Sequence, residues 1–516
     1  MNTGEFLQIS SVMVPDRDAL VCEGRRTTYM GLAQRVNRLA NALLSLGISR
    51  RDKVAVMSLN GSEVIETYYA CAKIGATFVP LNYRAKREEI TYMLNNSEAQ
   101  TLFVGPRYLD LVSAIRPELG AVKNFFCYGP AAEGMNSYED LLRSGSDEEV
   151  FVETGDDDPA MLLYTSGTTA LPKGVILTHL TLSVYVTNTM NPADPEAERE
   201  VTLLSVPLYH VAGATVPLSS IWGGRTLVML PQFEPELWLE TVQRERVTHS
   251  FVVPTMLKRI MEHPDFDKYD LSSLQVITYG AAPMPYEVVR RAVGVFKCAL
   301  MNAYGQTEST STLTYLGPED HRIEGTEEEK AKKLERLRSV GRAMDDIAIA
   351  IMNSRGEMLE PHQEGEICVS GARIMQEYFK REKETAAAVV DGWLHTGDVG
   401  YLDEDGYLFI TGRTKDLIIR GGENISPGEI EACLEDHPKI ADAAVIGVPD
   451  AEWGEKVMAV VVLKPGETLT KEEIVQYCKG RLASFKAPSE VTLVDELPRN
   501  PLGKVLKTDL RKTYGA

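Results

Sequence analysis

Between residues 164 and 174 the chain reads YTSGTTALPKG, a stretch in which hydroxyl residues, glycines and a lysine stand close together. Hydroxyls and backbone amides can donate hydrogen bonds to a phosphate, glycine lets the backbone approach an anion, and lysine adds a compact positive charge. The stretch therefore predicts a phosphate-binding loop, although an ordinary surface turn is the alternative when it is taken alone. The residues expected to bind are Thr165, Ser166, Gly167, Thr168, Thr169 and Lys173.

This loop differs from a Walker A motif, whose pattern is G-x-x-x-x-G-K-[ST]. Counting from Gly167, Pro172 stands at the second glycine position, and Gly174 follows Lys173 where Ser or Thr is required. Without that hydroxyl the loop has no Walker-type ligand for Mg²⁺. The pattern excludes a generic P-loop kinase and indicates that the cation is held elsewhere in the chain.

A second segment, NAYGQTES at residues 302–309, combines an aromatic ring with a hydroxyl and a carboxylate. Tyr304 is suited to stack on a purine, Thr307 to contact a phosphate, and Glu308 to give the oxygen ligand that a divalent cation prefers. Taken alone, the segment is equally typical of a loop at the end of a strand.

Two further segments add charged groups. Residues 392–431 contain Asp398, which lies between expected turns, and Arg413, fifteen residues further along the chain. A carboxylate can accept hydrogen bonds from both hydroxyls of a ribose, and arginine can reinforce that contact or pair with a phosphate. Near the end of the chain, LPRNPLGKVLKTDLRK places Lys504 after a glycine, for which a basic C-terminal fringe is the alternative interpretation.

The overall composition excludes several classes of function. The formal net charge of −20 argues against a general binder of nucleic acid or anionic membranes. The seven cysteines are scattered without a metal-binding spacing, which indicates reduced thiols and a cytoplasmic protein. The first residues do not follow the pattern of a signal peptide, and no apolar run approaches the roughly 18–20 residues of a membrane span.

Up to about residue 330, short apolar strands alternate with amphipathic helices, which favours parallel sheets in an α/β fold. Residues 31–46 predict one such helix, with an apolar face. The charge-dense residues 324–338 predict a solvated surface helix. We expect two α/β sub-domains that separate near the acidic segment 144–158. From about residue 340, short strands joined by Gly, Asp and Glu turns predict a small β-barrel-like sub-domain. After Gly412, a compact α+β unit follows, in which Thr470 and Glu473 predict the capping box of a helix.

Five motifs, YTSGTTALPKG, YGQTES, HTGDVGYLDEDGY, GRTKDLI and PRNPLGK, occur in the order and spacing of one family. The chain resembles the AMP-forming acyl-CoA synthetases of the adenylate-forming superfamily. That superfamily includes acyl- and aryl-CoA ligases, the adenylation domains of peptide synthetases and firefly luciferase. The resemblance extends over essentially the whole chain.

The resemblance implies a large N-terminal domain at residues 1–412, a hinge at 413–415 with Lys415 at the hinge position, and a small mobile C-terminal domain at 416–516. It also implies a two-step ligase that uses ATP, Mg²⁺ and coenzyme A. A carboxylate attacks the α-phosphorus of Mg-ATP to give acyl-AMP and pyrophosphate. The thiol of coenzyme A then displaces AMP.

By this resemblance, ATP is bound by residues from distant parts of the chain. The loop from Thr165 to Thr169, with Lys173, would hold the β- and γ-phosphates, and Asp398 with Arg413 would hold the ribose. Adenine would lie between the Tyr304 ring and a stretch of backbone. The other nucleotide-binding residues implied are Gly280, Ala281, Ala282, Asn302, Gly305 and Lys415.

The resemblance also assigns the catalytic residues. Thr307 would contact the α-phosphate, Glu308 would hold the Mg²⁺, and Lys504 would bridge the acid carboxylate and the α-phosphate as charge develops. A rotation about the hinge would then carry this lysine away and bring the RGGENISP face to line the path of the pantetheine. The residues implied on that face are Gly421 and Gly422.

The acid is expected beside His210, which resembles the family's aromatic-or-histidine gate and is counted with the catalytic residues. The candidate lining is small or apolar and lacks Lys and Arg, so a hydrophobic monocarboxylic acid is expected. A medium- or long-chain fatty acid is the first candidate, and an alicyclic or aromatic acid is the alternative. The predicted lining residues are His210, Val211, Tyr279, Gly280 and Ala303.

Other functions stay open at this point. A free-standing adenylation enzyme would load a carrier protein instead of coenzyme A, and a luciferase-like oxygenase is a further relative. A catalytically silent nucleotide-binding protein is disfavoured because Lys504, Glu308, Asp398 and Arg413 are all intact. The sequence leaves a homodimer open.

Two positions depart from the family's usual residues. Ala170 replaces a glycine in the phosphate loop, and if φ is positive there, alanine costs about 1 kcal/mol or more. Ala303 stands where many arylate ligases have glycine, so its methyl group would shorten or reshape the acyl pocket.

Overall fold

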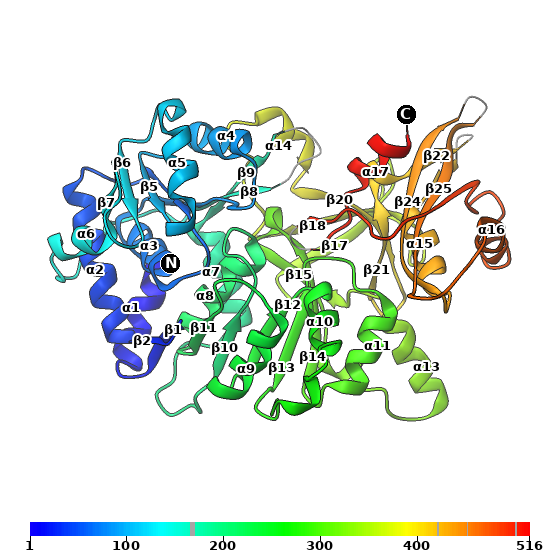
Figure 1. The fold of residues 1–516 in the computed structure, drawn as a ribbon, viewed down its shortest axis with the longest axis horizontal. Coiled ribbons are helices and arrows are strands. Elements are labelled where there is room, and N and C mark those ends of the chain that lie inside the picture. The colour runs from blue at the N-terminus through cyan, green and yellow to red at the C-terminus, as the bar shows by residue number, and fades with distance from the viewer. Residues whose placement is uncertain (166–170, 421–422, 451–452, 501–502, 516) are drawn as a thin grey trace.

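The computed structural model describes residues 1–165, 171–420, 423–450, 453–500 and 503–515. Within these ranges the strands form four sheets, three in the larger N-terminal part and one in the smaller C-terminal part (Figure 1). The chain is thus of the mixed α/β class that the alternating pattern predicts.

The first sheet is built from short strands that are almost continuously apolar, as strands covered on both faces must be. Its order is β7-β6-β5-β3-β4-β8-β9, and all neighbours are parallel except β8 and β9. The strands are β3 (Lys53–Met57), β4 (Thr77–Pro80), β5 (Thr101–Val104), β6 (Asn124–Cys127), β7 (Asn136–Ser137), β8 (Pro159–Thr165) and β9 (Lys173–Thr178).

The second sheet has the order β16-β15-β14-β13-β12-β10-β11-β1-β2. Its parallel centre is continued by antiparallel strands at both edges. The strands are β1 (Asp18–Cys22), β2 (Arg25–Thr28), β10 (Val201–Leu204), β11 (Thr226–Met229), β12 (His249–Val252), β13 (Val276–Gly280), β14 (Ala299–Gln306), β15 (Ser311–Leu316) and β16 (Arg342–Ala343).

The sub-domain break expected near residues 144–158 is therefore wrong. Strands β1 and β2 join the second sheet by pairing with β11, whereas β8 and β9, which follow the acidic segment, complete the first sheet. The acidic, glycine-punctuated composition of residues 144–158 is typical of a linker, but composition does not report which strands pair. Strand pairing between distant parts of the chain, which periodicity does not report, decides the sub-domains.

The third sheet is small and antiparallel, and it forms the β sub-domain expected after residue 340. Its order is β17-β18-β20-β19, with β21 paired to β20. The strands are β17 (Ile347–Met352), β18 (Gly365–Gly371), β19 (Val389–Val390), β20 (Trp393–Leu402) and β21 (Leu408–Arg413).

The fourth sheet carries the α+β unit at the C-terminal end, drawn in orange and red in Figure 1. Its order is β23-β22-β25-β24, with β26 parallel to β25. The strands are β22 (Ile418–Arg420), β23 (Glu423–Ile425), β24 (Ile440–Asp450), β25 (Gly454–Leu463) and β26 (Glu490–Leu493). The short helix η5 (Thr414–Asp416) connects this unit to β21, at the position expected for the hinge.

Helices cover the sheets with their apolar faces. Helix α2 begins where the Thr28 hydroxyl accepts from the Gly31 amide, and it buries Leu32, Val36 and Leu39. In contrast, α13 buries none of its side chains. The helices are α1 (Gly4–Met13), α2 (Tyr29–Ser45), α3 (Ser62–Ile74), α4 (Arg87–Ser97), α5 (Leu109–Ile115), α6 (Tyr138–Ser144), α7 (His179–Thr189), α8 (Val211–Trp222), α9 (Pro235–Glu245), α10 (Pro254–Met261), α11 (Tyr286–Val295), α12 (Pro318–His321), α13 (Glu327–Arg336), α14 (Glu382–Ala388), α15 (Pro427–Glu435), α16 (Lys471–Lys479) and α17 (Lys507–Tyr514).

None of the helices in the described ranges combines the length and the apolar character needed to cross a membrane.

Candidate active site

The expected phosphate loop connects two antiparallel strands at one edge of the first sheet. Strand β8 ends at Thr165 and β9 begins at Lys173, and these residues are cross-strand partners. The Thr165 hydroxyl donates to the Lys173 carbonyl over 3.4 Å, so the sheet fixes both ends of the loop. The remaining loop residues, and with them the φ angle of Ala170, lie outside the described residues. They are Ser166, Gly167, Thr168, Thr169 and Ala170.

Tyr378 connects this loop to Glu308. The ammonium group of Lys173 lies 5.0 Å from the centre of the Tyr378 ring, within cation–π range. The Tyr378 hydroxyl donates to Glu308 Oε1 over 2.8 Å. Burial and the Glu308 carboxylate both raise the pKa of Tyr378, so the phenol stays protonated and remains a donor. The candidate phosphate lysine and the candidate cation ligand are thus arranged around one ring.

The backbone just after Glu308 is strained and is supported by a buried arginine. Thr310 and Ser311 have φ angles of 51° and 80°, which are rare for residues with a side chain. The fully buried guanidinium of Arg373 donates to backbone carbonyls on both sides of this turn. It also forms a two-point ion pair with Asp346, at 2.6 and 3.0 Å. The ion pair therefore positions the segment that carries Glu308.

A three-residue cluster forms where β20 and β21 pair. The Tyr304 hydroxyl donates to Asp398 Oδ2 over 2.7 Å, and Arg413 Nε lies 2.7 Å from Asp398 Oδ1. Asp398 and Arg413 are cross-strand partners, and the Asp398 side chain is 7% exposed. Burial and the neighbouring carboxylate raise the pKa of Tyr304 well above its usual value. Residues far apart in the sequence, expected to hold adenine and ribose, are thus hydrogen-bonded to one another.

The backbone expected beside adenine leaves the end of β13 in an unusual conformation. Gly280 ends the strand so close to the Ala303 carbonyl that a β-carbon would overlap it. Ala281 follows with a φ angle of 63°, whereas Ala282 has no positive φ. Gly305 lies at the irregularity of β14, next to Tyr304. The strained alanine of the described site is therefore Ala281.

Replacing Ala281 with glycine is expected to raise the free energy of unfolding by about 0.5–1 kcal/mol, because glycine adopts positive φ without steric cost. The increase would appear as a higher melting temperature in calorimetry. The matched control is Ala282→Gly, which relieves no strain and is expected to lower stability. An equal fall in both variants would contradict the strain at Ala281.

The candidate acyl pocket begins at His210, which precedes the first turn of α8. The His210 ring packs on Tyr209 with 4.3 Å between the ring centres, and its Nε2 atom is buried with no hydrogen-bond partner among the described residues. Burial, reinforced by the positive charge of Arg84, lowers the pKa of His210 to about 3, so the ring is neutral. An uncharged ring is the expected neighbour of an apolar acid.

The other predicted lining residues occupy two adjacent strands and the start of α8. Val211 opens the helix and Ala303 pairs with Gly280 across β13 and β14. Tyr279 and Asn302 are also cross-strand partners, and both are buried. The Tyr279 hydroxyl lies 2.8 Å from His321 Nε2, so its polar end is already engaged inside the protein.

Lys504 lies beside the cluster of Asp398 and Arg413 although it belongs to the C-terminal unit. Burial lowers the pKa of Lys504 to about 8, and the positive charges of Arg413 and Lys415 contribute in the same direction. Gly503, with a φ angle of 80°, lies so close to Thr255 of the N-terminal part that a β-carbon would overlap its side chain. The lysine loop is thus docked on the N-terminal part.

The candidate hinge residue Lys415 lies in η5 and is itself partly buried. Its pKa is lowered by burial and by Arg413. The neighbouring Asp416 pairs with Arg511 at 2.9 Å, which ties the connector to α17. Gly421 and Gly422, predicted on the coenzyme A side, lie outside the described residues.

Comparison with known proteins identifies the family. A model of AMP-binding enzymes matches residues 8–379, and a model of the AMP-binding enzyme C-terminal domain matches residues 429–504. The first match alone covers more than half of the chain. The chain belongs to the AMP-binding enzyme family.

Named relatives cover the enzyme along its whole length. It is 36% identical over 516 residues to an indoleacetate–CoA ligase of Aromatoleum aromaticum, covering 99% of this chain and 98% of that one. It is 35% identical over 520 residues to the long-chain-fatty-acid–CoA ligase FadD13 of Mycobacterium tuberculosis, covering 100% and 99%. The structure of ATP-bound MatB from Rhodopseudomonas palustris matches with a TM-score of 0.89 and 30% identity, covering 100% and 99%.

The enzyme is an AMP-forming acid–CoA ligase that uses ATP, Mg²⁺ and coenzyme A. The family, enzyme class and cofactors implied by the five sequence motifs are thereby confirmed. The donor set at Glu308 fits the cation, because Mg²⁺ prefers carboxylate oxygen, and Tyr378 holds one oxygen of this carboxylate in a fixed orientation.

Sequence reasoning missed Tyr378, Arg373 and Asp346. Tyr378 stands in QEYFK, where no spacing distinguishes it from other aromatic residues. Backbone pairing between distant segments brings it to β9, through the bridge between Val175 and Tyr378 and the hydrogen bond from the Phe379 amide to the Gly174 carbonyl.

Proposed function

We propose that this ligase converts a hydrophobic monocarboxylic acid into its coenzyme A thioester, and that the acid is a medium- or long-chain fatty acid. The observation that carries the proposal is the buried, neutral His210 ring, whose neighbours in the predicted lining, Val211, Tyr279, Gly280 and Ala303, include no Lys or Arg. The second carboxylate of a dicarboxylic acid would need a cationic side chain among these lining residues. The 35% identity to a long-chain-fatty-acid–CoA ligase supports the same substrate class.

In the first step, Asp398 and Arg413 would hold the ribose, and Tyr304 would stack on adenine in the place that its hydrogen bond to Asp398 fixes. Lys173 and the loop from Thr165 would hold the β- and γ-phosphates. Glu308 would hold the Mg²⁺, which neutralises phosphate charge when it is bound. Thr307 would contact the α-phosphate.

Lys504 would supply the positive charge that stabilises the α-phosphate as the acid carboxylate attacks it. Its position beside Asp398 and Arg413 supports this role, because the α-phosphate follows the ribose in ATP. The bond from the α-phosphorus to the bridging oxygen breaks, and pyrophosphate leaves with the electron pair.

In the second step, the C-terminal domain at 416–516 would rotate about Lys415 relative to residues 1–412. The present contacts between the two parts include the docked lysine loop and two polar contacts. Ser426 donates to the Thr411 carbonyl, and Arg338 pairs with Asp436 at 3.4 Å. Exposed ion pairs of this kind contribute about 0–1 kcal/mol each, which is compatible with repeated domain movement.

Acyl-AMP formation should fall as the pH rises above about 8. The pKa of Lys504 is lowered from its usual value to about 8, so its charge is present below this pH and lost above it. At low ATP concentration, kcat/KM for pyrophosphate release should fall about tenfold per pH unit beyond that point. The residual rate of a Lys504→Arg variant, whose guanidinium stays charged, should not follow this decline. A wild-type kcat/KM that stays constant up to pH 10 would contradict this prediction.

A second substrate class, an aryl or arylalkanoic acid, is favoured by the 36% identity to an indoleacetate–CoA ligase. A panel of fatty and aromatic acids distinguishes the two classes by pyrophosphate release and by thioester formation with coenzyme A. The proposal expects the highest kcat/KM for a fatty acid. A higher value for an aromatic acid would overturn the fatty-acid proposal, and pyrophosphate release without any thioester would overturn the thioester product and favour a carrier protein as acceptor.

A further inference from the structure

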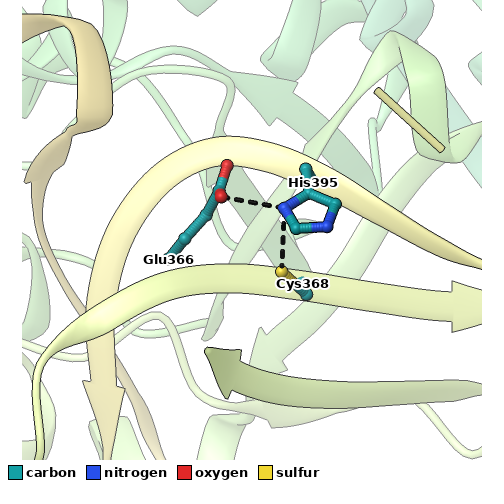
Figure 2. Close-up of side chains that lie close together, drawn as sticks. All are labelled: Glu366, Cys368 and His395. Carbon is teal, nitrogen blue, oxygen red and sulfur yellow. Dashed lines mark hydrogen bonds and ion pairs between the residues drawn. The ribbon is translucent and has the colours of Figure 1, made fainter. Parts of the chain in front are cut away.

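A group of three potential metal ligands lies in the small β sub-domain, outside the residues that the mechanism uses. Glu366 and Cys368 are on β18, and His395 is on β20. Cys368 and His395 are cross-strand partners, while Glu366 lies two positions earlier on the same strand. Figure 2 shows the three side chains pointing toward one another between the two strands.

The distances are close to those of a metal site. His395 Nδ1 lies 3.5 Å from Cys368 Sγ and 2.8 Å from Glu366 Oε2, and all three ligand atoms lie within 4.8 Å of one another. With Zn–S near 2.3 Å and Zn–N near 2.0–2.1 Å, tetrahedral ligation places sulfur and nitrogen about 3.5 Å apart. Only the carboxylate has to move outward, by a small side-chain rotation.

The chemical types point to one class of cation. Thiolate, imidazole and carboxylate together are ligands of Zn²⁺ and its neighbours in the first transition row, whereas Mg²⁺ and Ca²⁺ prefer oxygen alone. A thiolate and a carboxylate would balance the two charges of the cation. We propose that Glu366, Cys368 and His395 form a three-ligand site for a divalent cation of the Zn²⁺ class, with water as the fourth ligand.

The surroundings provide the support and the access that such a site needs. The second carboxylate oxygen of Glu366 accepts from the Gly397 amide over 3.1 Å, which orients the ligand. Cys368 is fully buried, next to Ala350, Met352 and Trp393, whereas the side chains of His395 and Glu366 are 25% and 27% exposed. The cation would therefore enter from the side of His395 and Glu366 and bind against the sulfur.

A bound cation would clamp β18 to β20 immediately before Asp398. Gly397, which donates to Glu366, directly precedes that residue, and Thr396 donates to the Ile367 carbonyl on β18 over 2.7 Å. Occupancy should therefore raise the melting temperature of the whole enzyme, because a ligand that binds only the folded state stabilises it.

The test uses Co²⁺ as a spectroscopic probe on the full-length enzyme, with Zn²⁺ as competitor. A thiolate bound to Co²⁺ produces a sulfur-to-metal charge-transfer band in the near ultraviolet, which the carboxylate at Glu308 cannot produce. The proposal expects this band at one Co²⁺ per chain, its loss on addition of Zn²⁺, and a higher melting temperature with Zn²⁺. The variants Cys368→Ser, His395→Gln and Glu366→Gln should each weaken binding at least tenfold.

The matched control is Cys298→Ser, because Cys298 is the partly exposed free thiol among the described cysteines and could bind metal adventitiously. The band should persist unchanged in this variant. If no charge-transfer band appears with Co²⁺ in excess, the three side chains only form hydrogen bonds with one another, and the proposed metal site is overturned. A band that survives in Cys368→Ser would also overturn it. Because His395→Gln and Glu366→Gln keep the thiol, they test the site even where Cys368→Ser folds poorly.

Discussion

Replacing Lys504 with alanine is expected to slow acyl-AMP formation by about 10²–10³-fold, the usual cost of removing one preorganised group that stabilises developing charge. The half-buried lysine is docked beside Asp398 and Arg413, and its lowered pKa indicates that it is desolvated there. A charge in such surroundings acts more strongly than one in water. The rate is measured as pyrophosphate release with the acid and ATP in the absence of coenzyme A.

The same variant should convert supplied acyl-AMP and coenzyme A to the thioester at nearly the normal rate, because Lys504 is expected to have moved away in that step. Lys512→Ala is the matched control, since this lysine belongs to the same tail and its side chain is 78% exposed. It should leave both half-reactions intact. An equal loss of both half-reactions in Lys504→Ala would mean that this lysine holds the C-terminal domain together and has no specific role in the first step.

The fold could be predicted from the sequence wherever periodicity sets the local structure. The helix expected at residues 31–46 is α2, and the solvated helix expected at 324–338 is α13. The helix cap expected from Thr470 and Glu473 forms at α16, where the Glu473 amide donates to the Thr470 hydroxyl over 3.2 Å. These features depend on residues three or four positions apart, so the sequence contains the information directly.

The division into sub-domains could not be predicted in this way. It depends on which distant strands pair, as β1 does with β11. The residues of the candidate site fall into the same two groups, those that the sequence indicates and those that only tertiary contacts reveal. Motif residues such as Asp398 and Arg413 stand out by chemical type and are found together on paired strands. Tyr378 and Arg373 act through contacts with segments far away in the sequence, and nothing in their own neighbourhood marks them.

The positions of backbone strain also depend on contacts between distant segments. The resemblance directs attention to Ala170 because a glycine is usual there, yet among the described non-glycine residues of the site the positive φ angles belong to Ala281, Thr310 and Ser311. Residue type predicts where glycine is preferred, whereas the geometry of close strands forces positive φ on residues that carry a side chain. Such strain persists only where the surrounding structure supports it.

Replacing Arg373 with alanine is expected to lower the free energy of unfolding by about 3 kcal/mol, because the change removes the donors of a fully buried guanidinium and leaves the Asp346 carboxylate, whose side chain is 15% exposed, without its arginine partner. Burial alone would raise the pKa of Asp346, but Arg373 outweighs it and lowers the pKa. Thermal unfolding of the variant measures the loss. Arg355→Ala is the matched control, because Arg355 lies in the same sub-domain with its side chain 77% exposed, and it should change stability by less than about 0.5 kcal/mol.

The double variant Arg373→Ala with Asp346→Ala separates the charge from the support of the backbone. Removing both charges should recover part of the stability, because no unpaired charge stays buried. It should not recover pyrophosphate release, since the carbonyls on both sides of the turn at Thr310 and Ser311 would still lack their donor. A double variant that regains activity with stability would show that the ion pair only stabilises the fold. A double variant that is stable but inactive would show that Arg373 positions the segment of Glu308.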